Sequence, residues 1–232
     1  MKLEGRRVIV TGGSRGIGYR ISELFLAEGA QVLAVSRDPV KLAEAQEQLP
    51  GLATLVADVA VASDVERIAA WAESEWGAVD VLMNNAGILH GDEPGLTVGP
   101  DEFFTSTLQV NVVGVYLCTK RLLPLLLKSD DPRIVNTGSM SGIIDAGLRD
   151  SYGVSKAALH ALTIATANEL RGKVPVNALS PGWVKTDMAP TGPGDPRNSA
   201  QAALSILMRP RDVTGKLFRG SRIRSWSTQF TS

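Results

Sequence analysis

Short runs of consecutive apolar residues alternate along the chain with longer segments in which apolar residues recur every three to four positions. The run at residues 8–10 is typical of a strand buried on both faces, and Ile21, Leu24 and Phe25 then mark one face of a helix. The pattern predicts strands at residues 8–11, 31–35, 52–57, 79–84, 133–137, 174–179 and 216–219, and helices at 16–28, 40–48, 63–76, 101–128, 152–171 and 199–208. This alternation predicts an α/β fold of the doubly wound Rossmann type, with a mostly parallel seven-stranded sheet between two layers of helices.

Composition and charge narrow the class of protein. The 232 residues are 44% hydrophobic and 21% charged, as in an ordinary globular protein. The formal net charge of zero argues against nucleic acid as a partner held by bulk attraction. Residues 209–224 nevertheless hold six basic side chains against one acidic one. An anionic partner could bind there, and a solvated surface is the alternative.

The scarce residue types exclude several further classes. The single cysteine, Cys118, sits in an apolar helical run and is expected to be buried and inert. Two histidines, His90 and His160, are too few for a histidine-rich metal site, so no metal is expected. No apolar stretch is long enough to cross a membrane, and the first strand begins too early to leave room for a signal peptide. A cytoplasmic protein without a membrane partner is expected.

A glycine-rich turn, TGGSRGIG at residues 11–18, follows the first strand. Gly12 and Gly13 allow a tight turn, and Gly16 and Gly18 let the next helix pack closely. The first amides of that helix are unpaired and lie at its positive end, where they can hold a phosphate. A strand, glycine turn, helix and second strand in this order predict half of a dinucleotide-binding fold.

The end of the second strand carries information on the cofactor. Ser36 stands where a carboxylate would bind the ribose of NAD, while Arg37 and the nearby Arg15 can clamp the 2′-phosphate of NADP. Asp38 is interpreted as the cap of the helix that begins near residue 39, although it could instead bind the ribose. The sequence therefore favours NADP(H) over NAD(H), with a plain surface role as the alternative for Arg37.

Two further strand ends carry polar residues. Asp58 could accept a bond from an adenine amino group or cap a turn, and the residues alone leave both open. The stretch Asn84-Asn85-Ala86-Gly87 lets the backbone run close to a flat ligand, although it would be unremarkable as a plain turn.

Tyr152 and Lys156 are four residues apart and so share one helix face. A phenol, with a pKa of about 10, is a poor base at neutral pH, and a neighbouring ammonium lowers that pKa. The pair can therefore run acid–base chemistry on a carbonyl or an alcohol. Ser139 ends the fifth strand, and its hydroxyl can bind the carbonyl oxygen there, with Ser141 as a neighbouring alternative.

The chain as a whole resembles members of the short-chain dehydrogenase/reductase family. The matching residues run in family order over nearly the whole chain: Thr11-Gly12-x-x-x-Gly16-Ile17-Gly18, Asp58, Asn84-Asn85-Ala86-Gly87, Asn111, Ser139, Tyr152-x-x-x-Lys156, Pro181-Gly182 and Thr186. The closing residues 213–219, with Trp226 after them, are similar to the end of carbonyl-reductase-like members.

The resemblance implies a role for each matching residue. Tyr152 would protonate the carbonyl oxygen, Lys156 would lower the tyrosine pKa and hold the nicotinamide ribose, and Ser139 would orient the substrate. Asn111 would hold a water that links Lys156 to solvent, whereas its residue type alone suggests a bond to its own helix backbone. The residues expected to bind the cofactor are Gly12, Ser14, Arg15, Gly16, Ile17, Gly18, Ser36, Arg37, Asp58, Val59, Asn85, Ala86, Gly87, Tyr152, Lys156, Pro181, Gly182, Val184 and Thr186.

The expected substrate is a small or medium apolar ketone or aldehyde. Its site is expected to include Ser139, Ser141, Ile143, Leu148, Tyr152, Trp183 and Met188. Leu89 and His90 could also line it, although a surface loop is the favoured place for His90. The Gly- and Pro-rich loops at residues 91–100 and 189–198 follow strand ends, where such sheets bind ligands, and the second is a candidate lid.

One domain over residues 1–232 is expected, because no linker, repeat or break in composition divides the chain. Residues 1–90 would mainly bind the cofactor, and 91–232 would carry catalysis and the substrate. Small residues along the 152–171 helix, among them Ala161 and Ala165, predict a homodimer or homotetramer through this helix and the 101–128 helix, with packing against the sheet as the alternative.

Taken together, the residues predict an NADP(H)-dependent carbonyl reductase or alcohol dehydrogenase. The alternatives are an NADP-binding regulator or scaffold without turnover and an NAD-linked alcohol dehydrogenase. An epimerase-like extended relative is disfavoured because the chain is too short for the substrate domain and spaces its glycines differently. An enoyl reductase is disfavoured because those enzymes space their tyrosine and lysine further apart.

Overall fold

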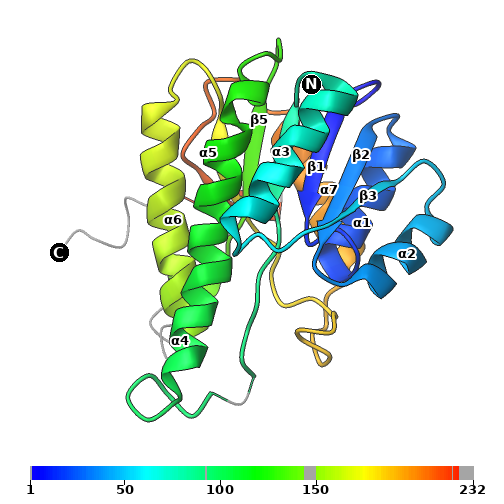
Figure 1. The fold of residues 1–232 in the computed structure, drawn as a ribbon. Helices are drawn as coiled ribbons and strands as arrows, with labels where there is room; N and C mark the ends of the chain where they lie inside the picture. The colour runs from blue at the N-terminus through cyan, green and yellow to red at the C-terminus, as the bar shows by residue number, and fades with distance from the viewer. Residues whose placement is uncertain (1, 92, 144–149, 221, 225–232) are drawn as a thin grey trace.

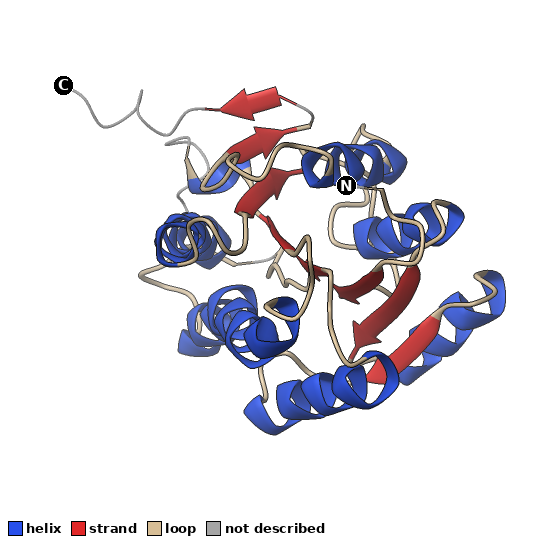
Figure 2. Ribbon diagram, turned by 90° about the horizontal axis from the view of Figure 1, so that it is seen from above, coloured by secondary structure: helices blue, strands red, loops and turns tan. Residues whose placement is uncertain are grey.

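The computed structural model describes residues 2–91, 93–143, 150–220 and 222–224, which form one twisted sheet with helices on both faces (Figures 1 and 2). The strand order is β3-β2-β1-β4-β5-β6-β7-β8. The strands are β1 Arg7–Thr11, β2 Gln31–Ser36, β3 Ala53–Val56, β4 Val81–Asn84, β5 Arg133–Thr137, β6 Val176–Ser180, β7 Leu217–Arg219 and β8 Arg222–Arg224. The α/β class and the mostly parallel sheet are confirmed.

The sheet reverses its direction of growth at β1. This strand pairs in parallel with β2 on one side, Val8 opposite Val32, and with β4 on the other, Val8 opposite Val81. The chain builds β2 and β3 outward on the first side and then returns to add β4 and β5 on the second. In open α/β sheets this reversal leaves a crevice at the carboxyl ends of the central strands, where ligands bind.

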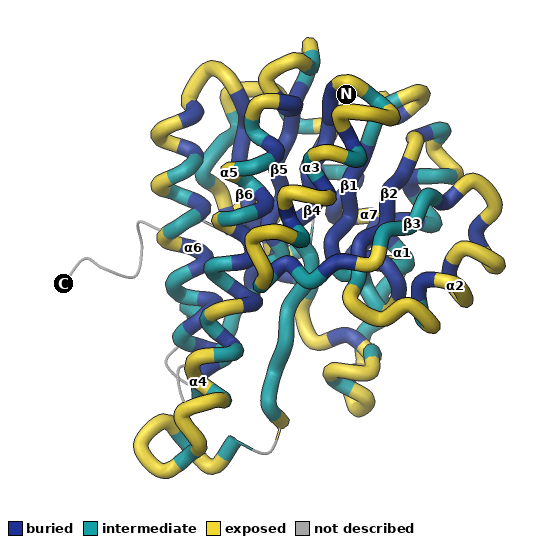
Figure 3. Tube along the Cα trace, in the orientation of Figure 1, coloured by how far each residue is buried: buried dark blue, intermediate teal, exposed yellow. Residues whose placement is uncertain are grey.

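Each face of the sheet has its own apolar core. The helices α1 Gly16–Ala27, α2 Pro39–Gln48 and α7 Pro196–Leu207 pack on one face around residues such as Phe25. On the other face lie α3 Ala62–Trp76, α5 Gly114–Leu126 and α6 Ser151–Glu169, around residues such as Ile68 and Leu122. The central strands are buried between these layers (Figure 3). This explains why they read as continuous apolar runs rather than alternating ones.

Two elements differ from the prediction. The described sheet has eight strands rather than seven, because Gly220, with φ of +59°, turns the chain back into β8, which runs antiparallel to β7. The predicted 101–128 helix is interrupted: α4 Asp101–Leu108 and α5 are joined by a π-helical turn, η1 Gln109–Val113. Such turns bulge one residue out of the regular ladder and often occur at functional sites.

None of the helices in the described ranges is long and apolar enough to span a bilayer. Cys118 is buried, and burial raises the pKa of its thiol to about 12, so the expectation of a buried, unreactive cysteine is met. The division of the chain near residue 90 stays a prediction.

Candidate active site

The glycine-rich turn packs directly on the end of β4. Gly12 has a φ of +65°, and a Cβ there would lie 2.9 Å from Cα of Ala86. A Cβ on Gly18 would lie 2.1 Å from the Gly12 carbonyl oxygen. Both positions therefore require glycine. The turn leads into α1, and Arg15 at the N-cap makes no side-chain cap there. The first-turn amides are thus available to a phosphate.

Thr11 joins the ends of β1 and β4. Its hydroxyl accepts the backbone N–H groups of Asn85 and Ala86 at 3.0 and 3.1 Å and donates to the Met83 carbonyl oxygen. The Asn85 side chain donates back to the Thr11 carbonyl oxygen at 3.1 Å. The predicted dinucleotide turn and the residues after β4 thus form one surface.

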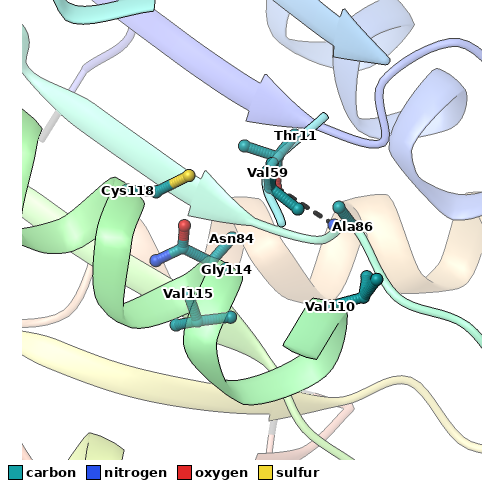
Figure 4. A pocket seen from close by; sticks show the side chains of 8 residues that line it. All are labelled: Thr11, Val59, Asn84, Ala86, Val110, Gly114, Val115 and Cys118. Carbon is teal, nitrogen blue, oxygen red and sulfur yellow. Dashed lines mark hydrogen bonds between the residues drawn. The ribbon is translucent and has the colours of Figure 1, made fainter. Parts of the chain in front are cut away.

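Figure 4 shows the space beneath this surface. This space is too small to hold a water molecule, so it is a gap between packed side chains rather than a ligand pocket. Its lining consists of Thr11, Val59, Asn84, Ala86, Val110, Gly114, Val115 and Cys118.

Asp38 caps α2, as predicted. One of its carboxylate oxygens accepts the backbone N–H groups of Val40 and Lys41, each at 3.1 Å. The Ser36 hydroxyl in turn accepts the backbone N–H of Asp38. One oxygen of the carboxylate that could have bound an NAD ribose is therefore engaged by the helix start.

Asp58 caps a turn, which is one of its two predicted roles, and it also makes an ion pair that was not predicted; its contact with an adenine amino group stays a prediction. It caps a turn by accepting the backbone N–H of Ala60 at 2.9 Å, and its other oxygen lies 3.8 Å from the exposed guanidinium of Arg37. This ion pair places Arg37 beside the end of β3, on the side of the crevice where β2 also ends.

The segment after β6 reaches across to the glycine turn. Arg15 pairs with Asp187 at 3.0 Å, and a Cβ on Gly16 would lie 3.3 Å from Thr186. Val184 makes an isolated bridge to Gly194, which folds the segment back on itself. The loop predicted at 189–198 ends earlier in the structure, because α7 begins at Pro196 and is capped by Asp195; its role as a lid stays a prediction.

Lys156 is buried beneath the crevice, with 3% of its surface exposed. Its Nζ donates to the Thr137 carbonyl oxygen at 2.7 Å. Burial lowers the lysine pKa to about 8. A Cβ on Gly87 would lie 3.7 Å from the same Nζ, so the lysine adjoins the predicted cofactor surface.

Tyr152 lies one turn earlier on α6, with its ring centroid 5.4 Å from Lys156 Nζ. Burial raises the tyrosine pKa above its ordinary 10.0, and a hydrogen bond with the Ser139 side chain acts in the opposite direction. The expected lowering by Lys156 is absent here: burial has the largest effect on the Tyr152 pKa, and the Lys156 ammonium is bonded to the Thr137 carbonyl oxygen. The expected meeting of Tyr152, Ser139 and Lys156 is present.

Asn111 lies in the π-helical turn and is fully buried. Its side chain binds both backbone groups of Ile88, at 2.8 and 2.9 Å, and donates to the Ser155 hydroxyl at 3.0 Å. Asn111 therefore ties the segment after β4 to α6 between Tyr152 and Lys156. Its role in holding a water stays a prediction.

The predicted substrate residues that the structure describes differ in how far they are buried. Ser141 and Ile143 are half-buried beside Ser139, whereas Trp183 and Met188 are 63% and 43% exposed. Leu148 lies outside the described residues. His90 is half-buried rather than on the surface: its ring stacks on Phe103 at 4.2 Å, and its Nε2 lies 3.0 Å from the Ser106 hydroxyl.

Two residues next to the site were missed from the sequence. His160 accepts the backbone N–H of Ser139 through Nε2 at 3.3 Å, and its spacing of four from Lys156 and eight from Tyr152 could have placed it on the same helix face. Glu93 accepts both the backbone N–H and the hydroxyl of Ser151 at the start of α6. No local signal pointed to Glu93, because its partner lies 58 residues away.

The family is decided by comparison with known proteins. The family model "short chain dehydrogenase" matches residues 6–194. The chain belongs to the short-chain dehydrogenase family. The chain is therefore an oxidoreductase of this family.

Individual short-chain dehydrogenases resemble this chain along most of its length. A rhamnolipids biosynthesis 3-oxoacyl-[acyl-carrier-protein] reductase of Pseudomonas aeruginosa is 35% identical, covering 91% of this chain and 87% of the relative. A 3-oxoacyl-[acyl-carrier-protein] reductase of Thermotoga maritima is 32% identical, covering 92% and 89%. The structure of the Pseudomonas aeruginosa RhlG/NADP active-site complex has a TM-score of 0.86 at 31% identity, covering 93% of this chain and 94% of that one.

Proposed function

We propose that this short-chain dehydrogenase is an NADP(H)-dependent reductase that converts a carbonyl group to an alcohol. The observation that carries the proposal is the meeting of Tyr152, Ser139 and Lys156 beside the backbone that follows β4. A regulator or scaffold would need the cofactor site but not a half-buried tyrosine and serine beside a buried lysine.

The residues of the crevice fit NADP(H). The uncapped amides of α1 suit the pyrophosphate, and Arg15 and Arg37 suit the 2′-phosphate. Asp38 caps α2 through one carboxylate oxygen, as expected of a helix cap rather than of a ribose-binding acid. Both arginines are paired with carboxylates while well exposed, and exposed ion pairs contribute little, so a phosphate can replace those partners. The similar structure of the Pseudomonas aeruginosa RhlG/NADP complex supports the same cofactor.

The chain's own residues supply the proton and the orientation. When bound, NADPH supplies the hydride to the carbonyl carbon. Tyr152 donates its phenolic proton to the carbonyl oxygen as the C–O bond becomes single, so the product is a neutral alcohol. Ser139 holds the carbonyl oxygen next to that phenol, and the Lys156 ammonium stabilises the phenolate that remains. The raised pKa of Tyr152 keeps its proton in place until the reaction.

The substrate in this proposal is a small or medium apolar ketone or aldehyde. A 3-oxoacyl thioester is a second candidate, supported by two relatives that are 3-oxoacyl-[acyl-carrier-protein] reductases. The proposal includes a homodimer or homotetramer formed through α6 and the α4–α5 segment. Its support is that Ala161 and Ala165 are exposed on α6, which leaves a face of small side chains for a second copy.

Cofactor titration tests the first half of the proposal. NADPH and NADH are titrated separately into the wild type, Arg37→Ala and, as a matched control, Arg171→Ala, an exposed arginine at the end of α6. Tight NADPH binding that weakens only in Arg37→Ala supports the proposal. A preference for NADH that neither change affects would assign the protein as an NAD-linked alcohol dehydrogenase.

Turnover tests the second half. Acetoacetyl-coenzyme A, an apolar ketone and an apolar aldehyde are offered with NADPH, and consumption of NADPH is followed by absorbance. Tyr152→Phe is expected to abolish turnover while NADPH still binds. A Tyr152→Phe variant as active as the wild type would refute the assigned proton donor, and a wild type that binds NADPH but reduces none of the carbonyls would favour the regulator.

A further inference from the structure

The imidazole of His160 lies directly against the end of β5. Its Nε2 accepts the backbone N–H of Ser139 at 3.3 Å. The ring is so close to Gly138 that a Cβ at that position would lie 2.5 Å from Nε2. Glycine before Ser139 therefore leaves the space in which the imidazole reaches the serine amide.

Residues from three successive turns of α6 contact the end of β5. Tyr152, Lys156 and His160 are spaced by four residues and share one helix face. The tyrosine contacts the Ser139 side chain, and the lysine donates to the Thr137 carbonyl oxygen. His160 adds the third contact, to the Ser139 backbone.

The imidazole is suited to accept this hydrogen bond because it is uncharged. His160 is 2% exposed, and burial, assisted by the charge of Lys156, lowers its pKa to about 3. A neutral imidazole keeps one ring nitrogen without a proton, and here the donated Ser139 N–H identifies Nε2 as that nitrogen. A charged imidazole would be a donor at both nitrogens and would repel the serine amide.

We propose that His160 is a positioning residue for carbonyl reduction: it holds the Ser139 backbone so that the serine hydroxyl meets Tyr152 and the substrate oxygen. The inference rests on the proposed function of Ser139 and Tyr152. The Ser139 hydroxyl also accepts the backbone N–H of Ser141 at 3.1 Å. Both the amide and the hydroxyl of Ser139 are thus held, which fixes the direction in which the hydroxyl points.

A double-mutant cycle tests the kinetic consequence. His160→Leu removes the acceptor, His160→Gln places an amide oxygen near Nε2, and each is made alone and with Ser139→Ala. With acetoacetyl-coenzyme A and saturating NADPH, His160→Leu is expected to lower kcat on the order of tenfold without changing the Kd for NADPH. His160→Gln should recover most of that loss. In the Ser139→Ala background, His160→Leu should cost less than about twofold, and an equal loss in both backgrounds would overturn the proposal.

A titration that needs no turnover separates this inference from the proposed function. The ionisation of Tyr152 is read from phenolate absorbance after subtracting the Tyr152→Phe protein. The Ser139 hydrogen bond lowers the Tyr152 pKa, so His160→Leu should raise it and His160→Gln should not. Lys156 and Asp150, the charged groups near the phenol, are unchanged in both variants. A shifted pKa in a protein that reduces no carbonyl would uphold the positioning role and reject the reductase.

Two further variants guard against a purely structural effect. Thr163→Val removes a buried hydrogen bond to Asn136 in the next turn of α6, so it should lower thermal stability without moving the Tyr152 pKa. Gly138→Ala pushes the imidazole from the opposite side and should raise the Tyr152 pKa as His160→Leu does. A Tyr152 pKa that stays at the wild-type value in both Gly138→Ala and His160→Leu would overturn the proposal.

Discussion

The Nζ atom of Lys156 lies 2.7 Å from the carbonyl oxygen of Thr137. This hydrogen bond joins the helix that carries Tyr152 to the strand that leads to Ser139, so the three proposed catalytic side chains hold their places through one helix and one strand end. It also gives a buried ammonium its partner, although burial still lowers the lysine pKa to about 8.

The pH dependence of reduction should follow Lys156. Below a pH of about 8 the lysine is charged, and above it the charge is lost, while the raised pKa of Tyr152 keeps the phenol protonated. We expect kcat/KM for acetoacetyl-coenzyme A to fall as the pH rises through about 8. In Lys156→Arg, whose guanidinium stays charged, the fall in kcat/KM should move to higher pH. A profile that stays level through this range would assign no role to the ammonium.

Asp187 should oppose the binding of NADPH. Its carboxylate holds Arg15 at 3.0 Å with both side chains more than half exposed, and it adds negative charge where the proposed 2′-phosphate would lie. Because exposed ion pairs contribute about 0–1 kcal/mol, Asp187→Asn should tighten NADPH binding by up to about fivefold. Fluorescence titration measures this, with Asp195→Asn as a control that changes an acidic residue of the same loop. Weaker binding in Asp187→Asn would instead show that the ion pair supports a loop position that the cofactor needs.

Glu93 should fasten the loop at residues 91–100 to the helix of Tyr152. It accepts the backbone N–H of Ser151 at 3.0 Å and the Ser151 hydroxyl at 2.5 Å, and Ser151 is fully buried. Glu93→Ala removes the acceptor of the buried Ser151 N–H, whereas the Ser151 hydroxyl keeps its hydrogen bond to Thr107 at 3.1 Å, so the free energy of unfolding should fall by about 1–3 kcal/mol. Urea denaturation measures the loss, and Glu102→Ala, an exposed acid on α4, is the control. Equal losses in the two variants would mean that the Ser151 contacts are not stabilising.

Those parts of the site that depend on neighbours in sequence could be predicted from the sequence. The four-residue spacing of Tyr152 and Lys156 and the Asp38-Pro39 helix start are local signals, and the structure shows both as expected. The buried parallel strands were equally readable, because a strand covered on both faces is a continuous apolar run.

The parts that depend on distant partners could not be predicted. His160 and Glu93 form their hydrogen bonds with residues 21 and 58 positions away in the sequence. The π-helical turn around Asn111 keeps the apolar pattern of a helix, and only its backbone hydrogen bonds distinguish it from an α-helical turn. The partners of the Asn111 side chain, Ile88 and Ser155, lie 23 and 44 residues away. The strand β8, Arg222–Arg224, is too short for its alternation of polar and apolar residues to signal a strand, and it is defined by its pairing with β7.

The buried imidazole of His160 should also make the protein lose stability in acid before its carboxylates titrate. The histidine pKa is about 3 in the folded protein against an ordinary 6.5, because burial and then Lys156 disfavour the charged form. Between these values the unfolded chain binds a proton that the folded chain does not. The free energy of unfolding therefore falls as the pH falls from 6.5 towards about 3, and this contribution then levels off.

Asp80 affects stability in a lower pH range than His160, so the effects of the two groups can be separated. Burial raises its pKa, but hydrogen bonds from Arg7 and Ser129 outweigh this and hold it at about 2 against an ordinary 3.8. Its stabilisation is complete above pH 3.8 and is lost as the pH falls through about 2. Urea denaturation at a series of pH values should thus show a flatter decline for His160→Gln than for the wild type between pH 6.5 and 3.8, whereas Asp80→Asn should keep the wild-type slope there. Parallel curves for His160→Gln and the wild type would mean that His160 takes up its proton in the folded protein as easily as in the unfolded chain, which its burial against Gly138 and Lys156 argues against.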